Sequence, residues 1–288
     1  MGKIKIATDS TADIPIHLRK SLNISVLPLT IITENREYKD GYEITPQEFY
    51  DILENSEKIP TSSQVTPLLN LDLYEETWKA GYTDLIQICL NSKGSHTWHN
   101  AVSASEMFYE EHPEAREQLK IHIFDSKNYS MAYGYAAVKA AIMAQMDESI
   151  DDILAFVEDW LEHARAVFVP MNLKFVKKSG RIPAAVAFVG DALGLKPVIT
   201  FIDGESKIIS KIRGDLKVVS SILDLVNKDR KPDTPYCIAA GSNAAQFEKL
   251  KANCQEALGC APDIEYYLGC IISQNAGPNA IGIIYYAK

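Results

Sequence analysis

The chain has 288 residues, 47% hydrophobic and 23% charged, enough to fill the core of one large domain or of two ordinary ones. Its net charge of -9 argues against a nucleic-acid partner and against adhesion to anionic membranes, because an acidic surface repels phosphate groups. No apolar run approaches the roughly 18 residues that span a bilayer, and the opening residues lack the apolar region of a secretion signal. We therefore expect a cytoplasmic protein without stable membrane insertion.

The cysteines are odd in number and form no C-x-x-C pair. Most of them stand among apolar neighbours, a pattern that predicts buried free thiols in a reducing compartment. They are Cys89, Cys237, Cys254, Cys260 and Cys270.

The first part of the chain alternates strand-like and helix-like segments. Short apolar runs predict strands at Ile4–Thr8, Ser25–Thr33, Leu85–Leu90, Ile121–Phe124 and Ala166–Val169. Helices are predicted over Thr97–Glu111 and Tyr129–Met146, and at two capping boxes that begin at Thr45 and Ser149. Such alternation indicates a parallel sheet covered by helices.

From about Met171 the pattern changes. The dipeptide Asp203-Gly204 between Lys196–Asp203 and Glu205–Arg213 predicts a β-hairpin. Further helices are predicted over Asn172–Lys178, Pro183–Leu193, residues 216–226 and Ala244–Leu258, and further strands over Tyr236–Ala240, Ile264–Leu268 and Ile281–Ala287. We therefore predict two domains, a parallel α/β domain over residues 1–168 and a mixed-sheet α/β domain over residues 169–288.

Two hydroxyl-rich loops are the candidate ligand sites. The common signatures of nucleotide binding, serine hydrolysis and zinc proteolysis are absent from the sequence. The loops Pro60–Gln64 and Asn91–Thr97 offer the hydroxyls of Thr61, Ser62, Ser92 and Ser95. Ligands of parallel α/β sheets bind beyond the carboxyl ends of strands, where a helix N-terminus favours an anion. The pattern predicts a carboxylate or phosphate ligand, and ordinary capping and turn chemistry is the alternative.

Four other residues carry weaker signals. His96 and His99 have the spacing of half a metal site, but no third ligand is identifiable, so surface histidines and no metal are the better interpretation. Arg181 follows a helix stop and Arg213 ends a strand, where either can simply be solvated.

Short motifs in a fixed order make the chain resemble the DegV family from one end to the other. The opening T-D-S-x-x-D is present as Thr8–Asp13, and the P-T-S-Q-P-S-P segment as Pro60–Pro67 with one extra serine. The remaining matches are Tyr38-Lys39-Asp40-Gly41, Asp125-Ser126, Gly180-Arg181-Ile182, Leu195-Lys196-Pro197 and Lys211-Ile212-Arg213.

The resemblance implies a two-domain fold that binds a long-chain fatty acid between the domains, with no cofactor. Some members are the binding subunits of bacterial fatty acid kinase in phospholipid metabolism, and present the acid to a separate ATP-dependent kinase. By motif position the carboxylate ligands become Thr61, Ser62 and Ser92, with Ser95 close by. Arg181 and Arg213 become a positive rim for a partner or a phosphate.

The sequence departs from the family pattern at two loops. The S-S-x-L-S-G-T-Y loop is replaced by the sequence from Asn91 to Trp98, and the H-x-G-P-G motif by Asn275–Asn279. The family histidine lies near the ligand carboxylate; Asn275 can replace its hydrogen bond but not its charge, and His96 could substitute if it points inward. The resemblance therefore supports lipid binding more strongly than service to a kinase.

The expected function is fatty-acid binding without enzymatic activity. Burying about 15 methylenes at about 0.8 kcal/mol each gives roughly 12 kcal/mol, which leaves micromolar affinity after association costs of at least about 4 kcal/mol. The alternatives are a phosphotransferase or esterase that uses the same hydroxyls, a binding protein for a different small anionic lipid, and a structural or regulatory protein with a vestigial cavity.

Overall fold

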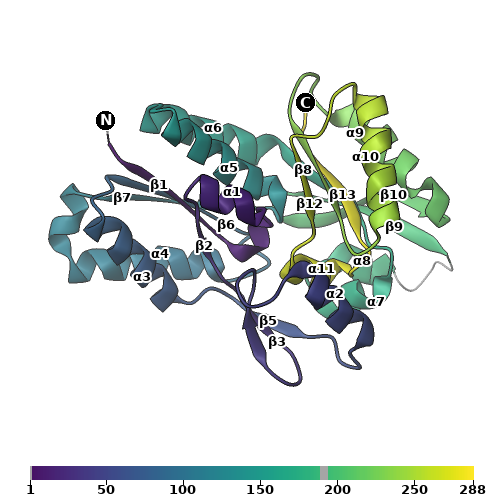
Figure 1. Cartoon of the computed structure of the whole chain (residues 1–288), viewed down its shortest axis with the longest axis horizontal. Helices are drawn as coiled ribbons and strands as arrows, with labels where there is room; N and C mark the ends of the chain where they lie inside the picture. The colour runs from purple at the N-terminus through teal and green to yellow at the C-terminus, as the bar shows by residue number, and fades with distance from the viewer. Residues whose placement is uncertain (1, 189–193) are drawn as a thin grey trace. The chain divides into compact units, whose positions relative to one another are not determined.

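A computed structural model describes residues 2–188 and 194–288 of the chain (Figure 1). These residues form two compact units, each made of two segments. The first unit comprises Met1–Thr30 and Ser63–Glu162, and the second comprises Ile31–Ser62 and His163–Lys288. This division differs from the predicted domains, because residues 31–62 and 163–168 group with the C-terminal part of the chain.

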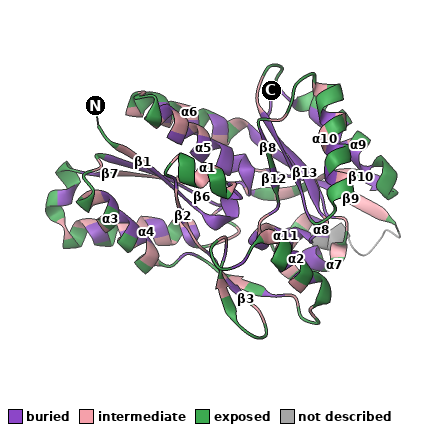
Figure 2. Ribbon diagram, viewed as in Figure 1, coloured by how far each residue is buried: buried purple, intermediate pink, exposed green. Residues whose placement is uncertain are grey.

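The first unit contains the predicted parallel sheet, which has four strands. The strand order is β2 (Ser25–Leu27), β1 (Ile4–Asp9), β6 (Asp84–Cys89) and β7 (Lys120–Asp125). Every residue of β6 is buried, including the polar Asp84 and Gln87, as expected for a central strand of a parallel sheet (Figure 2).

The helices of the first unit supply most of its core. Aromatic and aliphatic side chains of α3 and α4, among them Tyr74 and Phe108, pack with Leu85 of β6 in one buried cluster. At Gly134 of α5 a β-carbon would lie 2.3 Å from the carbonyl oxygen of Ala12, so this close approach requires glycine. The helices are α1 (Ile16–Ser21), α3 (Pro67–Lys79), α4 (Thr97–Glu111), α5 (Met131–Gln145) and α6 (Ile150–His163), with 3-10 turns η1 (Ser10–Ala12) and η2 (Pro113–Glu117).

One predicted strand of the first half is wrong in its extent. The run Ser25–Thr33 forms two strands, β2 and β3 (Thr30–Ile32), which belong to different sheets. Pro28 lies between them, and proline has no N–H with which to continue a ladder. The strand β3 pairs instead in a three-stranded sheet of order β4 (Glu37–Lys39), β3 and β5 (Thr61–Ser63).

The second unit contains the predicted mixed sheet. Its order is β10 (Glu205–Arg213), β9 (Leu195–Ile202), β8 (Ala164–Val169), β13 (Ile281–Tyr286), β11 (Tyr236–Ala240) and β12 (Ile264–Tyr267). The pair β11 and β12 is parallel, and the other neighbours run antiparallel. The hairpin at Asp203-Gly204 is confirmed, with positive φ at both residues as a type I′ turn requires.

The strand over Ala166–Val169 exists, but its expected place in the parallel sheet is wrong. It is β8 of the mixed sheet and runs antiparallel to β13. Its apolar residues indicate that the strand is buried but not the direction of its partners.

Helices on the second unit enclose two buried clusters. The larger one joins α9 to strands β8, β11 and β13, and the smaller one contains Val176, Ile182, Ala185 and Ile199. The capping box at Thr45 is confirmed at the start of α2. The helices are α2 (Pro46–Asn55), α7 (Leu173–Ser179), α8 (Pro183–Phe188), α9 (Val218–Asp229), α10 (Ala244–Leu258) and α11 (Cys270–Ala276), with the 3-10 turn η3 (Asp215–Lys217).

The predicted helix Pro183–Leu193 is observed up to Phe188, and its remainder lies outside the described residues. Four of the five cysteines are buried thiols and Cys260 is exposed. In the part of the chain that the structure describes, each helix is too short or too polar to cross a bilayer.

Candidate functional site

The carboxylate of Asp9 ends β1 and accepts hydrogen bonds from several segments of the first unit. It accepts from the backbone N–H of Leu90 at 2.8 Å, the hydroxyl of Tyr133 at 2.7 Å and the backbone N–H of Thr11 at 3.0 Å. The hydroxyl of Thr11 donates to it as well. Burial raises the pKa of Asp9, while these hydrogen bonds favour its ionised form. Asp9 therefore holds the ends of β1 and β6 against α5.

The second aspartate of the opening motif has a similar structural contact. Asp13 has a left-handed backbone with φ of 55° and accepts a 2.6 Å hydrogen bond from the hydroxyl of Ser130. The backbone N–H of Ser130 donates to the carbonyl of Thr11 at 3.1 Å. The opening T-D-S-x-x-D motif thus stabilises, through buried hydrogen bonds, the loops that follow the strands of the parallel sheet.

The loop Asn91–Thr97 follows β6, and Ser92 in it is bound to Asp125 at the end of β7. The hydroxyl of Ser92 donates to one carboxylate oxygen at 2.5 Å, and its backbone N–H donates to the other at 3.0 Å. A serine hydroxyl has a single proton to donate. A ligand carboxylate would therefore have to displace Asp125 in order to receive that proton.

Ser95 is better placed than Ser92 to donate. Its hydroxyl oxygen lies 3.0 Å from that of Thr97 and accepts a 3.3 Å hydrogen bond from the Thr97 backbone N–H. The oxygen of Thr97 also accepts from the backbone N–H of Val65 at 3.4 Å. When Thr97 donates its proton to Ser95, the proton of Ser95 remains available for a ligand.

The side chains at the start of α4 divide into exposed and half-buried groups. His96 is exposed, and its ring packs against His99 with centroids 5.4 Å apart. Trp98 is half-buried, and its indole N–H is buried without a partner among residues 2–188 and 194–288. The N–H of Trp98 is thus a donor in this loop that the sequence prediction missed.

In the second unit, the residues predicted to bind the carboxylate lie on β5 and α11. Thr61 is exposed and Ser62 is half-buried. Asn275 donates from its amide nitrogen to the carbonyl of Ile271 in its own helix at 2.6 Å. The neighbouring Gln274, which the sequence analysis did not select, lies with its amide nitrogen 3.5 Å from the hydroxyl oxygen of Ser62.

Both predicted arginines are exposed. Arg181 lies between α7 and α8, with its backbone N–H donating to the Ser179 hydroxyl at 3.2 Å, and Arg213 is the last residue of β10.

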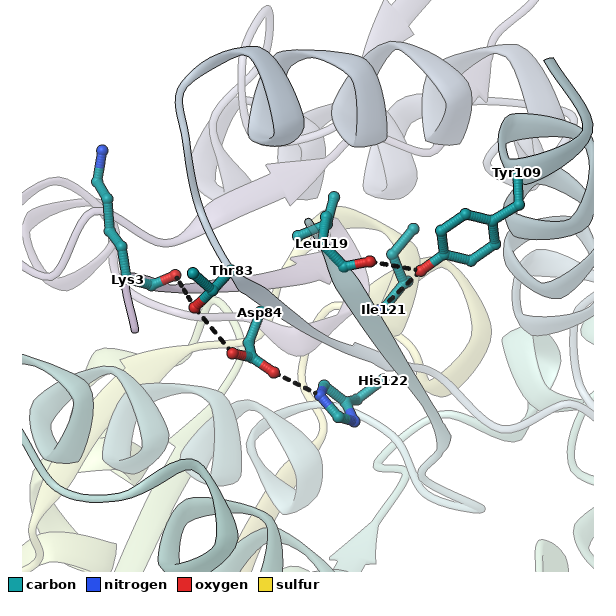
Figure 3. A network of polar contacts seen from close by, with 7 residues as sticks. All are labelled: Lys3, Thr83, Asp84, Tyr109, Leu119, Ile121 and His122. Carbon is teal, nitrogen blue, oxygen red and sulfur yellow. Dashed lines mark hydrogen bonds and ion pairs between the residues drawn. The ribbon is translucent and has the colours of Figure 1, made fainter. Parts of the chain in front are cut away.

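A separate polar network lies at the amino ends of β6 and β7 (Figure 3). The carboxylate of Asp84 accepts from the hydroxyl of Thr83 at 2.9 Å and lies 3.0 Å from the ring nitrogen of His122. Tyr109 of α4 bonds to β7 and to the residue before it in the same view. Ligands of parallel sheets bind at the opposite edge, so this network is structural.

Among residues 2–188 and 194–288, one group of side chains has its potential metal-ligand atoms close together, namely Glu75, Glu111 and His112. Glu75 is already paired with Lys79 of the same helix. Exposed acidic groups of this kind are explained by surface ion pairs. The pair His96 and His99 does not belong to this group.

Comparison with known families places the whole chain in one of them. A profile described as an uncharacterised protein of the DegV family matches residues 3–288. The chain is 31% identical over 290 residues to the DegV domain-containing protein TTE1491 of Caldanaerobacter subterraneus, with 100% of both chains covered. It is 30% identical over 292 residues to Protein DegV of Bacillus subtilis, with 99% of both covered.

Solved structures with the same fold are described as fatty-acid-binding proteins. A DegV family protein from Thermus thermophilus, described by its fatty acid binding, is 26% identical and superposes with a TM-score of 0.87 over 99% of this chain and 100% of that one. DegV of Bacillus subtilis, described as a fatty acid binding protein, is 27% identical with a TM-score of 0.86 over 100% of both chains.

Proposed function

Because this chain belongs to the DegV family, we propose that it binds one long-chain fatty acid and is not an enzyme on its own. The observation that carries the proposal is the full-length similarity to two solved fatty-acid-binding members, at 26% and 27% identity. The sequence lacks the common catalytic signatures, which favours a binding role over a phosphotransferase or an esterase.

The hydroxyls of Thr61, Ser62 and Ser95 are the proposed donors to the carboxylate. An anionic head group that leaves water must be hydrogen-bonded, and hydroxyl protons supply those bonds. Ser92 contributes only if its proton leaves Asp125. The roles of His96 and Asn275 at the carboxylate stay predictions. The ring of His96 is exposed, and the amide of Asn275 already donates to the carbonyl of Ile271 in its own helix.

The second part of the proposal is that the bound acid is presented in the cytoplasm to a separate ATP-dependent fatty acid kinase. Residues 171–217 contain nine lysines and arginines against four acidic residues, although the whole chain has a net charge of -9. Arg181 and Arg213 lie in this segment and are exposed. A basic segment on an acidic protein suits an acidic partner surface or a phosphate in transfer.

The first test is mass spectrometry of the purified protein, under native conditions and after denaturation with organic extraction. We expect one fatty acid per chain, in a complex that disappears on denaturation. A protein that is empty and also shows no rise in melting temperature with palmitate or oleate would refute the proposal. A different anionic lipid at one-to-one ratio would keep the binding function but change its ligand.

A further inference from the structure

Helix α11 carries two adjacent amides with different surroundings. One N–H of Asn275 is used within the helix, by the carbonyl of Ile271. Gln274 is only 8% exposed, and its amide nitrogen lies at 3.5 Å from the hydroxyl oxygen of Ser62. The amide oxygen of Gln274 is buried and has no hydrogen-bond partner in residues 2–188 and 194–288.

An amide left in this state is unfavourable unless something else completes its hydrogen bonds. A buried polar atom without a partner costs about 1–3 kcal/mol of stability. The two ends of a glutamine amide exchange places by a half-turn of the terminal group. After that turn, Ser62 can donate to the amide oxygen, and the two N–H protons of Gln274 occupy the position without a partner.

The pair therefore has the chemistry to bind a carboxylate. In one orientation the amide donates to Ser62, whose own proton is then free for a ligand; in the other the amide itself supplies the donors. Both arrangements provide a hydrogen-bond donor to a carboxylate, which can only accept, and neither adds a charged side chain. The pair is built within the second unit, from β5 and α11, and Tyr50 of α2 is bonded at 2.5 Å to the carbonyl of Leu268, two residues before α11.

We propose that Gln274, together with Ser62, is a head-group residue that binds the carboxylate of the fatty acid. Gln274, rather than Asn275, is then the amide of this helix that recognises the ligand. The inference rests on the proposed fatty-acid binding and names a further head-group-binding residue for it. Substituting Gln274 affects every monocarboxylic acid by the same factor, because the amide contacts the head group and not the tail.

The test measures affinities of delipidated wild-type and Gln274→Met protein for lauric, myristic and palmitic acid. Methionine keeps the length and flexibility of glutamine without its polar atoms. We expect about a tenfold loss for all three acids, the effect of one hydrogen bond to a charged group, with the gain in affinity per methylene unchanged. The matched control Gln255→Met removes an exposed glutamine of α10 and should keep the wild-type affinities.

Two further variants keep the test decisive if Gln274→Met folds poorly. Gln274→Glu has nearly the same shape and should weaken binding at least as much, because it places a second carboxylate beside that of the fatty acid. Ser62→Ala changes a half-buried residue of β5. If Ser62 and Gln274 act as a unit, the double variant Ser62→Ala/Gln274→Met should lose less binding free energy than the sum of the two single losses. Melting temperatures of all variants separate unfolding from weakened binding.

Different failures have different meanings. If the wild-type protein binds none of the acids, the proposed function itself fails. If the wild-type protein binds them and Gln274→Met and Gln274→Glu bind equally well, the inference about Gln274 is wrong and fatty-acid binding stands. The inference is also overturned if affinity falls only for the longer acids, or if Asn275→Ala weakens binding more than Gln274→Met does.

Discussion

Two carboxylates of the first unit, those of Asp9 and Asp125, and the side-chain amide of Gln274 in the second unit differ in how fully they are hydrogen-bonded. In the first unit the carboxylates of Asp9 and Asp125 accept several hydrogen bonds each, and the proton of Ser92 is used by Asp125. In the second unit the amide oxygen of Gln274 is buried without a partner among the described residues. Polar residues of a sequence motif can therefore serve the fold, whereas a buried group with an unpaired atom is a candidate ligand contact.

The largest effect on stability is expected from Asp9→Ala, which removes a buried carboxylate that accepts several hydrogen bonds. Four donors, three of them from Thr11 and Leu90, lose their buried acceptor in this variant. We expect the free energy of unfolding to fall by about 3 kcal/mol or more, measured by urea denaturation. Asp72→Ala, at an exposed position of α3, is the control and should change stability by less than about 0.5 kcal/mol. Equal stabilities of the two variants would contradict a structural role for Asp9.

A smaller effect is expected from Asp125→Ala. Three donors lose their acceptor, namely the backbone N–H and hydroxyl of Ser92 and the backbone N–H of Lys127. Asp125 is only half-buried, so water can replace part of what is lost, and we expect a decrease of about 1–2 kcal/mol in the free energy of unfolding.

The same variant sharpens the question of what Ser92 does. Removing Asp125 frees the Ser92 proton for a fatty acid carboxylate, so affinity for palmitate should rise in Asp125→Ala if Ser92 faces the ligand. Adding Ser92→Ala would then abolish the gain. Unchanged affinity in both variants would mean that Ser92 serves the loop alone.

The smallest effect is expected at the opposite edge of the parallel sheet, from Tyr109→Phe. The Tyr109 hydroxyl donates to the carbonyl of Leu119 at 2.9 Å and accepts from the backbone N–H of Ile121 at 3.2 Å (Figure 3). Losing both contacts at a partly buried site should lower the free energy of unfolding by about 1 kcal/mol. Fatty acid affinity should not change, and a change of more than about threefold would show that this edge also influences the ligand.

Local sequence signals predicted most elements of the fold. The helix Thr97–Glu111, the strand Tyr236–Ala240 and the helix Ala244–Leu258 are observed with the predicted bounds. The helix α3 was missed, although Thr66 caps it and Pro67 stands at its first position. The elements that were predicted correctly share one cause, since apolar periodicity and capping act within a few residues of the chain.

The predictions that depended on partners far along the chain were less complete. The sequence did not reveal that Ser25–Thr33 divides between two sheets, or that β8 pairs antiparallel with β13. An apolar run reports burial, and it carries no information about which strand lies beside it.

The sequence by itself determined the family, the parallel and mixed sheets, the hairpin at Asp203-Gly204 and the hydroxyl motifs, because each depends on residue types at fixed local spacing. Only the tertiary structure decided how the donors of those motifs are used: Ser92 by Asp125, Asn275 by its own helix, and Gln274 beside Ser62 with one atom unpaired. The physical reason is that a polar side chain satisfies its hydrogen bonds with whatever group lies nearest in space. Ser62 and Gln274 are separated by more than two hundred residues, and only folding brings them into contact.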